Sequence, residues 1–334
     1  MIRAAVIGYG YWGPNIVRNF KSCGAIDLAC VCDVSAQQLE LVKKAYPEVR
    51  TTQSVAEVLG DASIDAVAII TPVASHFELG MQALAAGKHV WIEKPITASS
   101  DEARRMCDEA AKRSRVLFVD HTFIYTGAVR KLHELIGAKE IGKLCCYDSV
   151  RSNLGLYRRD VNVLWDLAVH DVSIMDYVLR PRVTAVSATG VANIAGMPEA
   201  SAFMTCFLEG NALMHVHADW FSPVKGRTTT ITGDRRMIVY DDNEQVEKVR
   251  VWDRGVEVTP SAGGGPPVLS YRNGSYVAPE LPKLEALSVA ATHFAESIEQ
   301  GKPPITDGEF GFRVVQVLEA AIRSLHDRGR PVEL

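Results

Sequence analysis

The sequence predicts an α/β domain with a doubly wound parallel sheet, followed by an α+β domain with a large, mostly antiparallel open sheet. Up to about residue 121, apolar segments rich in β-formers alternate with helical patterns. This alternation is typical of a parallel sheet covered by helices on both faces. After a helical pattern near 128–136, strand-like segments follow one another with only turns between them, which indicates antiparallel pairing. We therefore expect two domains, at 1–121 and 122–334.

The spacing of apolar residues gives the expected elements in order. In the first half we expect strands at 4–8, 28–33, 66–72, 89–93 and 116–121, separated by helices at 14–21, 36–46, 75–86 and 101–113. In the second half we expect strands at 144–151, 184–191, 202–208, 212–220, 228–231, 237–240 and 249–252. Amphipathic helices at 284–299 and 310–328 close the chain.

Composition excludes several classes of protein. The formal net charge of the 334 residues is −4, which argues against binding to nucleic acid or to an anionic membrane. No apolar segment reaches the roughly 20 residues that a membrane span needs. The seven cysteines lie scattered without paired CxxC spacing, so we expect reduced thiols and no metal site. Since the N-terminus has no signal-peptide pattern, we expect a cytoplasmic protein.

A glycine-rich loop follows the first expected strand and opens the first helix. It fits the pattern G-x-G-x-x-G, and Pro14 suits the first helical position. A glycine triplet alone is a weak signal, but glycines in this place let the backbone approach a pyrophosphate closely, and the helix N-terminus offers free N–H groups. We therefore predict a Rossmann dinucleotide site with contacts from Gly8, Gly10, Tyr11, Trp12 and Gly13.

Asp33 ends the second expected strand, 20 residues after Gly13. This is the spacing expected of the carboxylate that binds the adenosine ribose. Such a carboxylate would repel a 2′-phosphate, and residues 34–38 offer no cation to receive one. We therefore expect NAD as the cofactor in preference to NADP. The alternative is a sharp strand–helix turn followed by an aspartate that caps the next helix.

The strand expected at 89–93 runs directly into Lys94 and Pro95. Ligands of open α/β sheets bind beyond the carboxyl ends of the strands, so we expect Lys94 in the cofactor crevice. There its charge can stabilise the oxygen that changes its charge during hydride transfer; the alternative is a solvated lysine at a turn. The Lys94–Pro95 bond is also a candidate cis peptide bond. The neighbouring strand ends in the same crevice with further candidate contacts at Thr71, Pro72 and His76.

Together these features resemble the Gfo/Idh/MocA oxidoreductases over essentially the whole chain. The resemblance rests on the glycine loop, Thr71-Pro72, Glu93-Lys94-Pro95 and a later Asp-x-x-x-His. It implies that Lys94 is the catalytic lysine and that Glu93 lies with it in the cofactor site. It also implies that the open sheet of the second domain mediates homodimers or homotetramers.

A helical pattern at 166–179 brings an acid and a base together. Its apolar stripe lies at 168, 172, 175 and 179, whereas Asp166 and His170, at i and i+4, share another face. A carboxylate beside an imidazole raises its basicity and fixes its tautomer, as a general base requires. From the residues alone, an incidental polar pair is an alternative. The resemblance implies that the Asp-x-x-x-His motif of the family falls on Asp166 and His170 and does the acid–base work.

The segment 151–165 precedes this helix and lacks the glycine-rich approach that is commoner in the family. It resembles the branch acting on sugar nucleotides, notably the UDP-N-acetylglucosamine and UDP-N-acetylglucosaminuronate 3-dehydrogenases. Arginines at 151, 158 and 159 could pair with diphosphate or a carboxylate, although each can equally be an ordinary surface residue. The candidate substrate contacts are His121, Arg151, Arg158, Asn162, Trp165 and His170; for His121, a satisfied histidine at the domain junction is an equal alternative.

We therefore predict an NAD-dependent dehydrogenase that acts on a secondary hydroxyl of a sugar, at C3 of a UDP-N-acetylhexosamine or its uronate. In this prediction Lys94 polarises the oxygen, and His170, supported by Asp166, takes the hydroxyl proton. The alternatives are an inositol or free-sugar dehydrogenase of the same family and, from another class, a non-catalytic dinucleotide-binding regulator.

Overall fold

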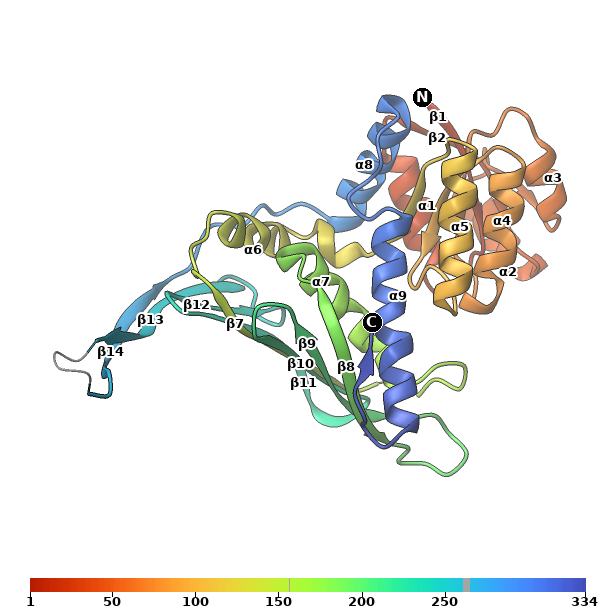
Figure 1. Cartoon of the computed structure of the whole chain (residues 1–334). Helices are drawn as coiled ribbons and strands as arrows, with labels where there is room; N and C mark the ends of the chain where they lie inside the picture. The colour runs from red at the N-terminus through yellow and green to blue at the C-terminus, as the bar shows by residue number, and fades with distance from the viewer. Residues whose placement is uncertain (156, 261–264) are drawn as a thin grey trace. The chain divides into compact units, whose positions relative to one another are not determined.

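The computed structural model describes the chain except residue 156 and residues 261–264. Its architecture confirms the predicted class, an α/β unit with a parallel sheet and an α+β unit with a mostly antiparallel sheet (Figure 1). The described residues form two compact units, Met1–Thr126 with Leu284–Gln316 and Gly127–Lys283 with Val317–Leu334.

The first unit is built on a six-stranded sheet in the order β3-β2-β1-β4-β5-β6, in which every pair of neighbours is parallel. The strands are β1 (Ile2–Ile7), β2 (Ile26–Cys32), β3 (Arg50–Thr52), β4 (Ala66–Ile69), β5 (His89–Glu93) and β6 (Leu117–Asp120). The helices of the N-terminal segment are α1 (Gly13–Ser22), α2 (Ala36–Ala45), α3 (Val55–Gly60), α4 (His76–Ala85) and α5 (Ser100–Lys112), with short 3-10 turns η1 (Val73–Ser75) and η2 (Thr122–Tyr125). Sequence patterning missed β3 and α3, because three and six residues are too few to show a period.

Helix α8 (Ala286–Gln300) completes the aromatic core of this unit. The ring centroid of Phe294 lies 5.6 Å from those of Trp91 and Phe118, and α8 packs against α1. Beside this contact, Arg18 Nη1 donates to Glu285 Oε2 at 2.9 Å. Residues 284–316 therefore belong to the first unit, whereas we expected them in the second domain.

The second unit contains a nine-stranded sheet, counted over the described residues, in the order β14-β13-β12-β11-β7-β10-β9-β8-β15. Among the described strands of this sheet, only β7 and β10 pair in parallel. The strands are β7 (Leu144–Leu154), β8 (Val183–Val191), β9 (Ser201–Leu208), β10 (Ala212–Asp219), β11 (Phe221–Gly233), β12 (Met237–Asp241), β13 (Val249–Thr259), β14 (Val268–Val277) and β15 (Val332–Glu333). β14 was not predicted, because glycine, asparagine and serine interrupt its apolar pattern.

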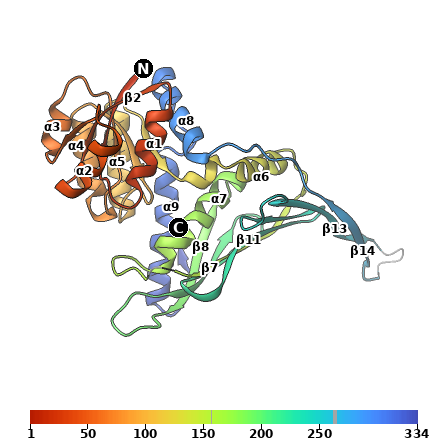
Figure 2. The same cartoon turned by 180° about the vertical axis from the view of Figure 1, so that it is seen from behind.

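Helices α6 (Gly127–Gly137) and α7 (Val169–Leu179) lie along one face of this sheet (Figure 2). Strands β9 and β10 accordingly alternate, with Met204 and Met214 fully buried while Phe203, Phe207 and Leu213 are exposed. Helix α9 (Gly308–His326) begins in the first unit and ends in the second. The second face of the sheet has no helix on it among the described residues.

A buried ion pair fastens α7 to the sheet. Arg151, on β7, donates from Nε to Asp171 Oδ2 at 2.8 Å and from Nη2 to Asp171 Oδ1 at 3.1 Å. Ser149 donates its hydroxyl to the same carboxylate at 2.6 Å. Both charged side chains are at least 95% shielded from solvent, so each charge depends on the other for compensation. The pair fixes the first turn of α7, which carries His170.

All seven cysteines are free thiols. In the part of the chain that the structure describes, none of the helices is both long and apolar enough to cross a membrane.

We expect Arg151→Met to lower the free energy of unfolding by about 3–5 kcal/mol, because Asp171 would stay buried as an uncompensated charge. Urea unfolding followed by circular dichroism measures this. Arg182→Met, at an exposed arginine of the same unit, should change the value by less than about 1 kcal/mol. The double variant Arg151→Met/Asp171→Leu should recover part of the loss; an equal loss in both variants would show that packing, and not the unpaired charge, sets the cost.

Candidate active site

The three glycines of the loop between β1 and α1 have different surroundings. Gly8 has a φ of 100°, and a Cβ there would lie 2.5 Å from the carbonyl oxygen of Ile70. A Cβ on Gly13 would lie 2.6 Å from the carbonyl oxygen of Gly8, whereas a Cβ on Gly10 would meet no described atom within 4 Å. In a dinucleotide loop the first glycine makes the turn, the third permits close packing and the second lets the pyrophosphate approach. The loop therefore fits a pyrophosphate.

Asp33 follows β2 and holds this loop. Its Oδ2 accepts from the Tyr9 N–H at 2.6 Å, and its Oδ1 accepts from the Ser35 N–H at 2.8 Å. Ser35, and not Asp33, caps α2, so the helix-capping alternative does not describe this aspartate. Because a carboxylate has about four acceptor positions, Asp33 retains acceptor capacity for ribose hydroxyls. On the same loop Tyr11 is exposed and Trp12 is half-buried.

Lys94 leaves β5 at its carboxyl end, half-buried, and its bond to Pro95 is cis, which confirms that prediction. His76 lies next to it, with Nδ1 2.9 Å from the carbonyl oxygen of Pro95 and Nε2 2.8 Å from that of Thr71. Burial lowers the pKa of His76, whose side chain is 1% exposed. Both ring nitrogens face backbone carbonyl oxygens, and the neutral imidazole donates its single N–H to one of the two, so His76 packs between the segments that follow β4 and β5. This is a structural task and differs from the direct cofactor contact that we expected.

Two carboxyl groups end adjacent strands beside Lys94. Glu93 and Asp120 are register partners on β5 and β6, so their side chains leave the sheet on the same face. Burial, and then the charge of Asp120, raise the pKa of Glu93 well above its usual value, and burial raises the pKa of Asp120 to about 6. Both shifts favour the neutral, protonated forms of these carboxyl groups.

His121 follows Asp120 and is 1% exposed. Burial, together with the charge of Lys94, lowers its pKa to about 3, and its ring packs edge-on against Phe310 at 5.2 Å. Within the described residues, hydrogen-bond partners are lacking for both ring nitrogens of His121 and for Glu93 Oε2. Buried polar atoms without partners are rare in folded proteins. Their position at the ends of neighbouring strands fits a polar ligand beside Lys94.

In the second unit, Asp166 lies in a π-helical turn, η3 (Leu164–Ala168), that leads into α7. Its Oδ2 accepts from the indole N–H of Trp220 at 2.9 Å, and Arg158 Nη1 lies 3.7 Å from its Oδ1. His170 stands in the first turn of α7 and is half-buried. The sequence pattern predicted an unbroken α-helix here. A π turn holds more than four residues, so positions i and i+4 still lie within one turn.

The predicted substrate contacts of this unit have different surroundings. Arg158 pairs with Asp160 through two contacts, at 3.1 and 2.7 Å, and keeps 45% of its side chain exposed. Asn162 is buried, accepts from the Trp165 N–H at 3.3 Å and donates to Glu199 at 3.1 Å, so it shapes the π turn. Trp165 is half-buried. Arg151 directs its guanidinium to Asp171 in the core, which differs from the diphosphate contact that we expected.

Sequence reasoning missed Asp120, Asp171 and Trp220. Asp120 could have been predicted from the sequence, because it ends the strand next to that of Glu93 and parallel strands align their ends. Asp171 stands beside His170, and a carboxylate in an otherwise buried helix requires a partner. Trp220 lies 54 residues from Asp166 on a neighbouring element, and nothing local in the sequence connects the two.

Two protein-family models match the chain. One, described as an oxidoreductase family with an NAD-binding Rossmann fold, matches residues 2–121, and the other, the GFO/IDH/MocA C-terminal domain, matches residues 129–239. The scyllo-inositol 2-dehydrogenase (NAD(+)) of Bacillus subtilis is 27% identical over 348 residues, which cover 100% of this chain and 96% of the relative.

The UDP-N-acetylglucosamine 3-dehydrogenase of Acidithiobacillus ferrooxidans is 28% identical over 324 residues, 94% of each chain. A solved structure of the enzyme of that name from the same organism has a TM-score of 0.83 and 25% identity, and the match covers 98% of each chain. These matches agree with the geometry of the glycine loop: the first unit is an NAD-binding Rossmann domain.

We expect Gly10→Val to leave the fold intact and to weaken NAD binding at least roughly tenfold, because the new side chain would fill the space through which the pyrophosphate approaches. Isothermal titration gives the affinity and thermal unfolding gives the stability. Gly24→Val is the matched control, since a Cβ on Gly24 also meets no described atom within 4 Å. An unchanged NAD affinity in the Gly10 variant would contradict the assignment of this loop.

The carboxyl pair predicts a dependence of stability on pH. The pKa of Asp120 rises from 3.8 to about 6 on folding, so the folded protein retains a proton that the unfolded chain releases. The stability contributed by this group is therefore lost as pH rises through the interval between these two values. Asp120→Asn should gain stability relative to the wild type on going from about pH 4 to pH 7, by on the order of 2 kcal/mol. Asp108→Asn, at an exposed aspartate, should show no such trend; equal trends in both variants would refute the effect of burial.

Proposed function

This chain belongs to the Gfo/Idh/MocA oxidoreductase family, and we propose that it oxidises or reduces C3 of a UDP-linked N-acetylhexosamine or its uronate. The coarser statement, an NAD-binding dehydrogenase of the sugar and polyol type, follows from family membership. The observation that carries the finer proposal is Arg158, which keeps an exposed guanidinium next to the π turn of Asp166. A second arginine, Arg159, is exposed beside it.

The proposed chemistry assigns a separate task to each group. NAD, when bound, exchanges a hydride with the carbon that carries the reacting oxygen. Lys94 stabilises negative charge on that oxygen, since an ammonium ion is a strong charge-assisted donor. His170 accepts the hydroxyl proton in oxidation and returns it in reduction. Asp166 supports His170, and the Trp220 N–H fixes the orientation of the Asp166 carboxylate.

The positive charge of Lys94 acts on both buried carboxyl groups: it lowers the pKa of Glu93 and of Asp120 against the effect of burial. Two ionised carboxylates would overcompensate its charge, whereas a pair that shares one proton carries a single negative charge. We propose that Glu93 and Asp120 together carry one negative charge and so compensate the single charge of Lys94.

Diphosphate distinguishes the proposed substrate from a free sugar. Guanidinium groups bind phosphate oxygens through paired hydrogen bonds, and Arg158 is placed to change its partner from Asp160 to such a group. An inositol dehydrogenase is the second candidate, because a scyllo-inositol 2-dehydrogenase is 27% identical over the whole chain. A free cyclitol offers no phosphate to Arg158, which would then keep its ion pair with Asp160.

We also propose a homodimer or homotetramer that forms through the uncovered face of the nine-stranded sheet. Phe203, Phe207 and Leu213 are 46%, 37% and 42% exposed on neighbouring strands of that face. Large exposed apolar patches usually mark interaction surfaces. The free thiols support our proposal that the enzyme works in the reducing cytoplasm.

The test is a substrate panel followed by the absorbance of reduced nicotinamide. We expect UDP-N-acetylglucosamine or its uronate to reduce NAD, and free N-acetylglucosamine to be a far poorer substrate because the binding energy of the nucleotide is missing. NADP should replace NAD poorly because of Asp33. Turnover of inositol or a free hexose, with every UDP-sugar inert, would replace the proposal by its alternative.

Variants in the same assay test the assigned roles. Lys94→Ala and His170→Ala should each lower kcat by at least ~10²-fold while NAD still binds; Lys112→Ala and His326→Ala, at exposed positions, serve as controls. Arg158→Gln should raise KM for the UDP-sugar about tenfold or more and leave turnover of a free sugar unchanged. A normal KM in this variant would remove the arginine from the substrate site.

A further inference from the structure

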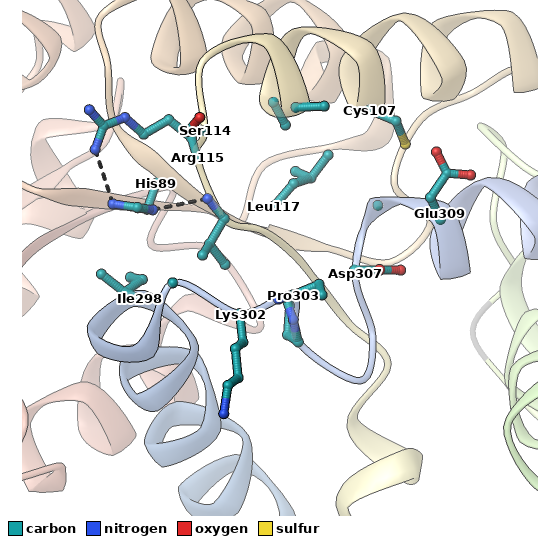
Figure 3. A pocket seen from close by; sticks show the side chains of 16 residues that line it. His89, Cys107, Ser114, Arg115, Leu117, Ile298, Lys302, Pro303, Asp307 and Glu309 are labelled. Carbon is teal, nitrogen blue, oxygen red and sulfur yellow. Dashed lines mark hydrogen bonds between the residues drawn. The ribbon is translucent and has the colours of Figure 1, made fainter.

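A groove of about 530 Å³ opens at the amino ends of β5 and β6, within the first unit (Figure 3). Its walls are the end of α5, the starts of the two strands and the segment 301–309 that joins α8 to α9. Lys94 and its neighbours leave the opposite, carboxyl ends of the same strands, so the groove lies outside the cofactor crevice. Its volume is that of a small-molecule site, and part of its lining is apolar, from Ala110, Leu117, Ile298 and Pro303.

At the polar end of the groove, two hydrogen-bond donors approach the two ring nitrogens of His89. The Val116 N–H donates to His89 Nδ1 at 3.0 Å, and Arg115 Nη1 lies 3.2 Å from His89 Nε2; Figure 3 marks both contacts. Burial, and then the charge of Arg115, lower the pKa of His89 to about 4, so the imidazole is neutral at physiological pH. A neutral imidazole accepts at only one of its two nitrogens. The two contacts therefore cannot both be hydrogen bonds.

The backbone contact is the one that persists. Val116 is buried at the start of β6, and a buried N–H without an acceptor is costly. Arg115 is exposed and can exchange its contact for water. His89 therefore accepts at Nδ1 and carries its proton on Nε2, which points at the guanidinium of Arg115. Two donors face each other across 3.2 Å, and one of them is cationic.

The other charged groups of the groove do not provide an acceptor between Arg115 and His89. Glu309 forms its ion pair with Arg104, Asp307 accepts from the Phe310 N–H at 2.8 Å, and Lys302 points away from Arg115 in Figure 3. Among the described residues, no carboxylate lies within ion-pair distance of Arg115. An anionic oxygen between Arg115 and His89 would accept from both donors.

We propose that this groove binds a small organic carboxylate, with the carboxylate on Arg115 and His89 Nε2–H and the apolar part along the groove. One cation and one neutral donor match the single charge of a carboxylate, whereas a phosphate dianion would require more positive charge. The proposal makes no use of the reaction assigned to the crevice, and its test needs no turnover.

The test titrates the whole protein with 4-phenylbutyrate and, separately, with its neutral amide, and follows heat and thermal unfolding. We expect saturable binding of the carboxylate and an affinity for the amide at least tenfold weaker, since a charge-assisted hydrogen bond is the stronger kind. Arg115→Gln should weaken the affinity for 4-phenylbutyrate at least tenfold. Lys302→Gln removes the same charge from the rim of the groove and should change the affinity less than about threefold. Equal binding of carboxylate and amide, or normal binding by the Arg115 variant, would overturn the proposal.

Two further measurements separate the remaining outcomes. Nitrogen-15 NMR of the histidine rings reports the tautomer of His89 directly: a proton on Nε2 supports the argument, and a proton on Nδ1 overturns it. Inorganic phosphate that competes with 4-phenylbutyrate in the wild type, and not in the Arg115 variant, supports a common acceptor position. Phosphate that binds while 4-phenylbutyrate does not would overturn the assignment to a carboxylate.

Discussion

Parallel strands end at one common edge of a sheet, and the chemistry of the first unit depends on this constraint. Asp33, Lys94 and His121 each follow the last residues of a strand, and Glu93 and Asp120 are themselves such residues. The sheet is covered on both faces, so polar groups that end its strands are shielded from water while they remain next to one another. Desolvation then raises the pKa of the acids and lowers that of the histidine. The fold thus shifts the pKa values of ordinary residues by placing them at this edge of the sheet.

The parts of this structure that could be predicted from the sequence are those with a local signal. The alternation of strand and helix, the glycine loop and the strand that runs into Lys94 are contiguous patterns, and the structure confirms these elements. The assignment of residues 284–316 could not be predicted, because an amphipathic helix shows that it has an apolar face but not which apolar surface it meets. The structure shows that the apolar face of this helix packs on the first unit, where Phe294 contacts Trp91 and Phe118.

In the candidate site, too, local patterns could be predicted from the sequence and long-range contacts could not. The spacing of Asp166 and His170 can be read from the five residues 166–170, yet the partners that position these two side chains cannot be read from a local segment. Arg151 lies 20 residues from Asp171 and Trp220 lies 54 from Asp166, and a long-range polar contact has no signature in one sequence. An exposed arginine and a buried one also look alike in a sequence. The difference between Arg151 and Arg158 becomes visible once the alternation of β7 shows that Tyr147, Ser149 and Arg151 point inward.

The order of the units along the chain has a consequence for synthesis. The first unit begins at residue 1, but the helix that closes its aromatic core is translated only after residues 127–283 of the second unit. On the ribosome, the surfaces of Phe20, Trp91 and Phe118 that Phe294 contacts stay uncovered while most of the second sheet emerges. The aromatic contacts of Phe294 with Phe20, Trp91 and Phe118 therefore cannot form until residue 294 has been translated.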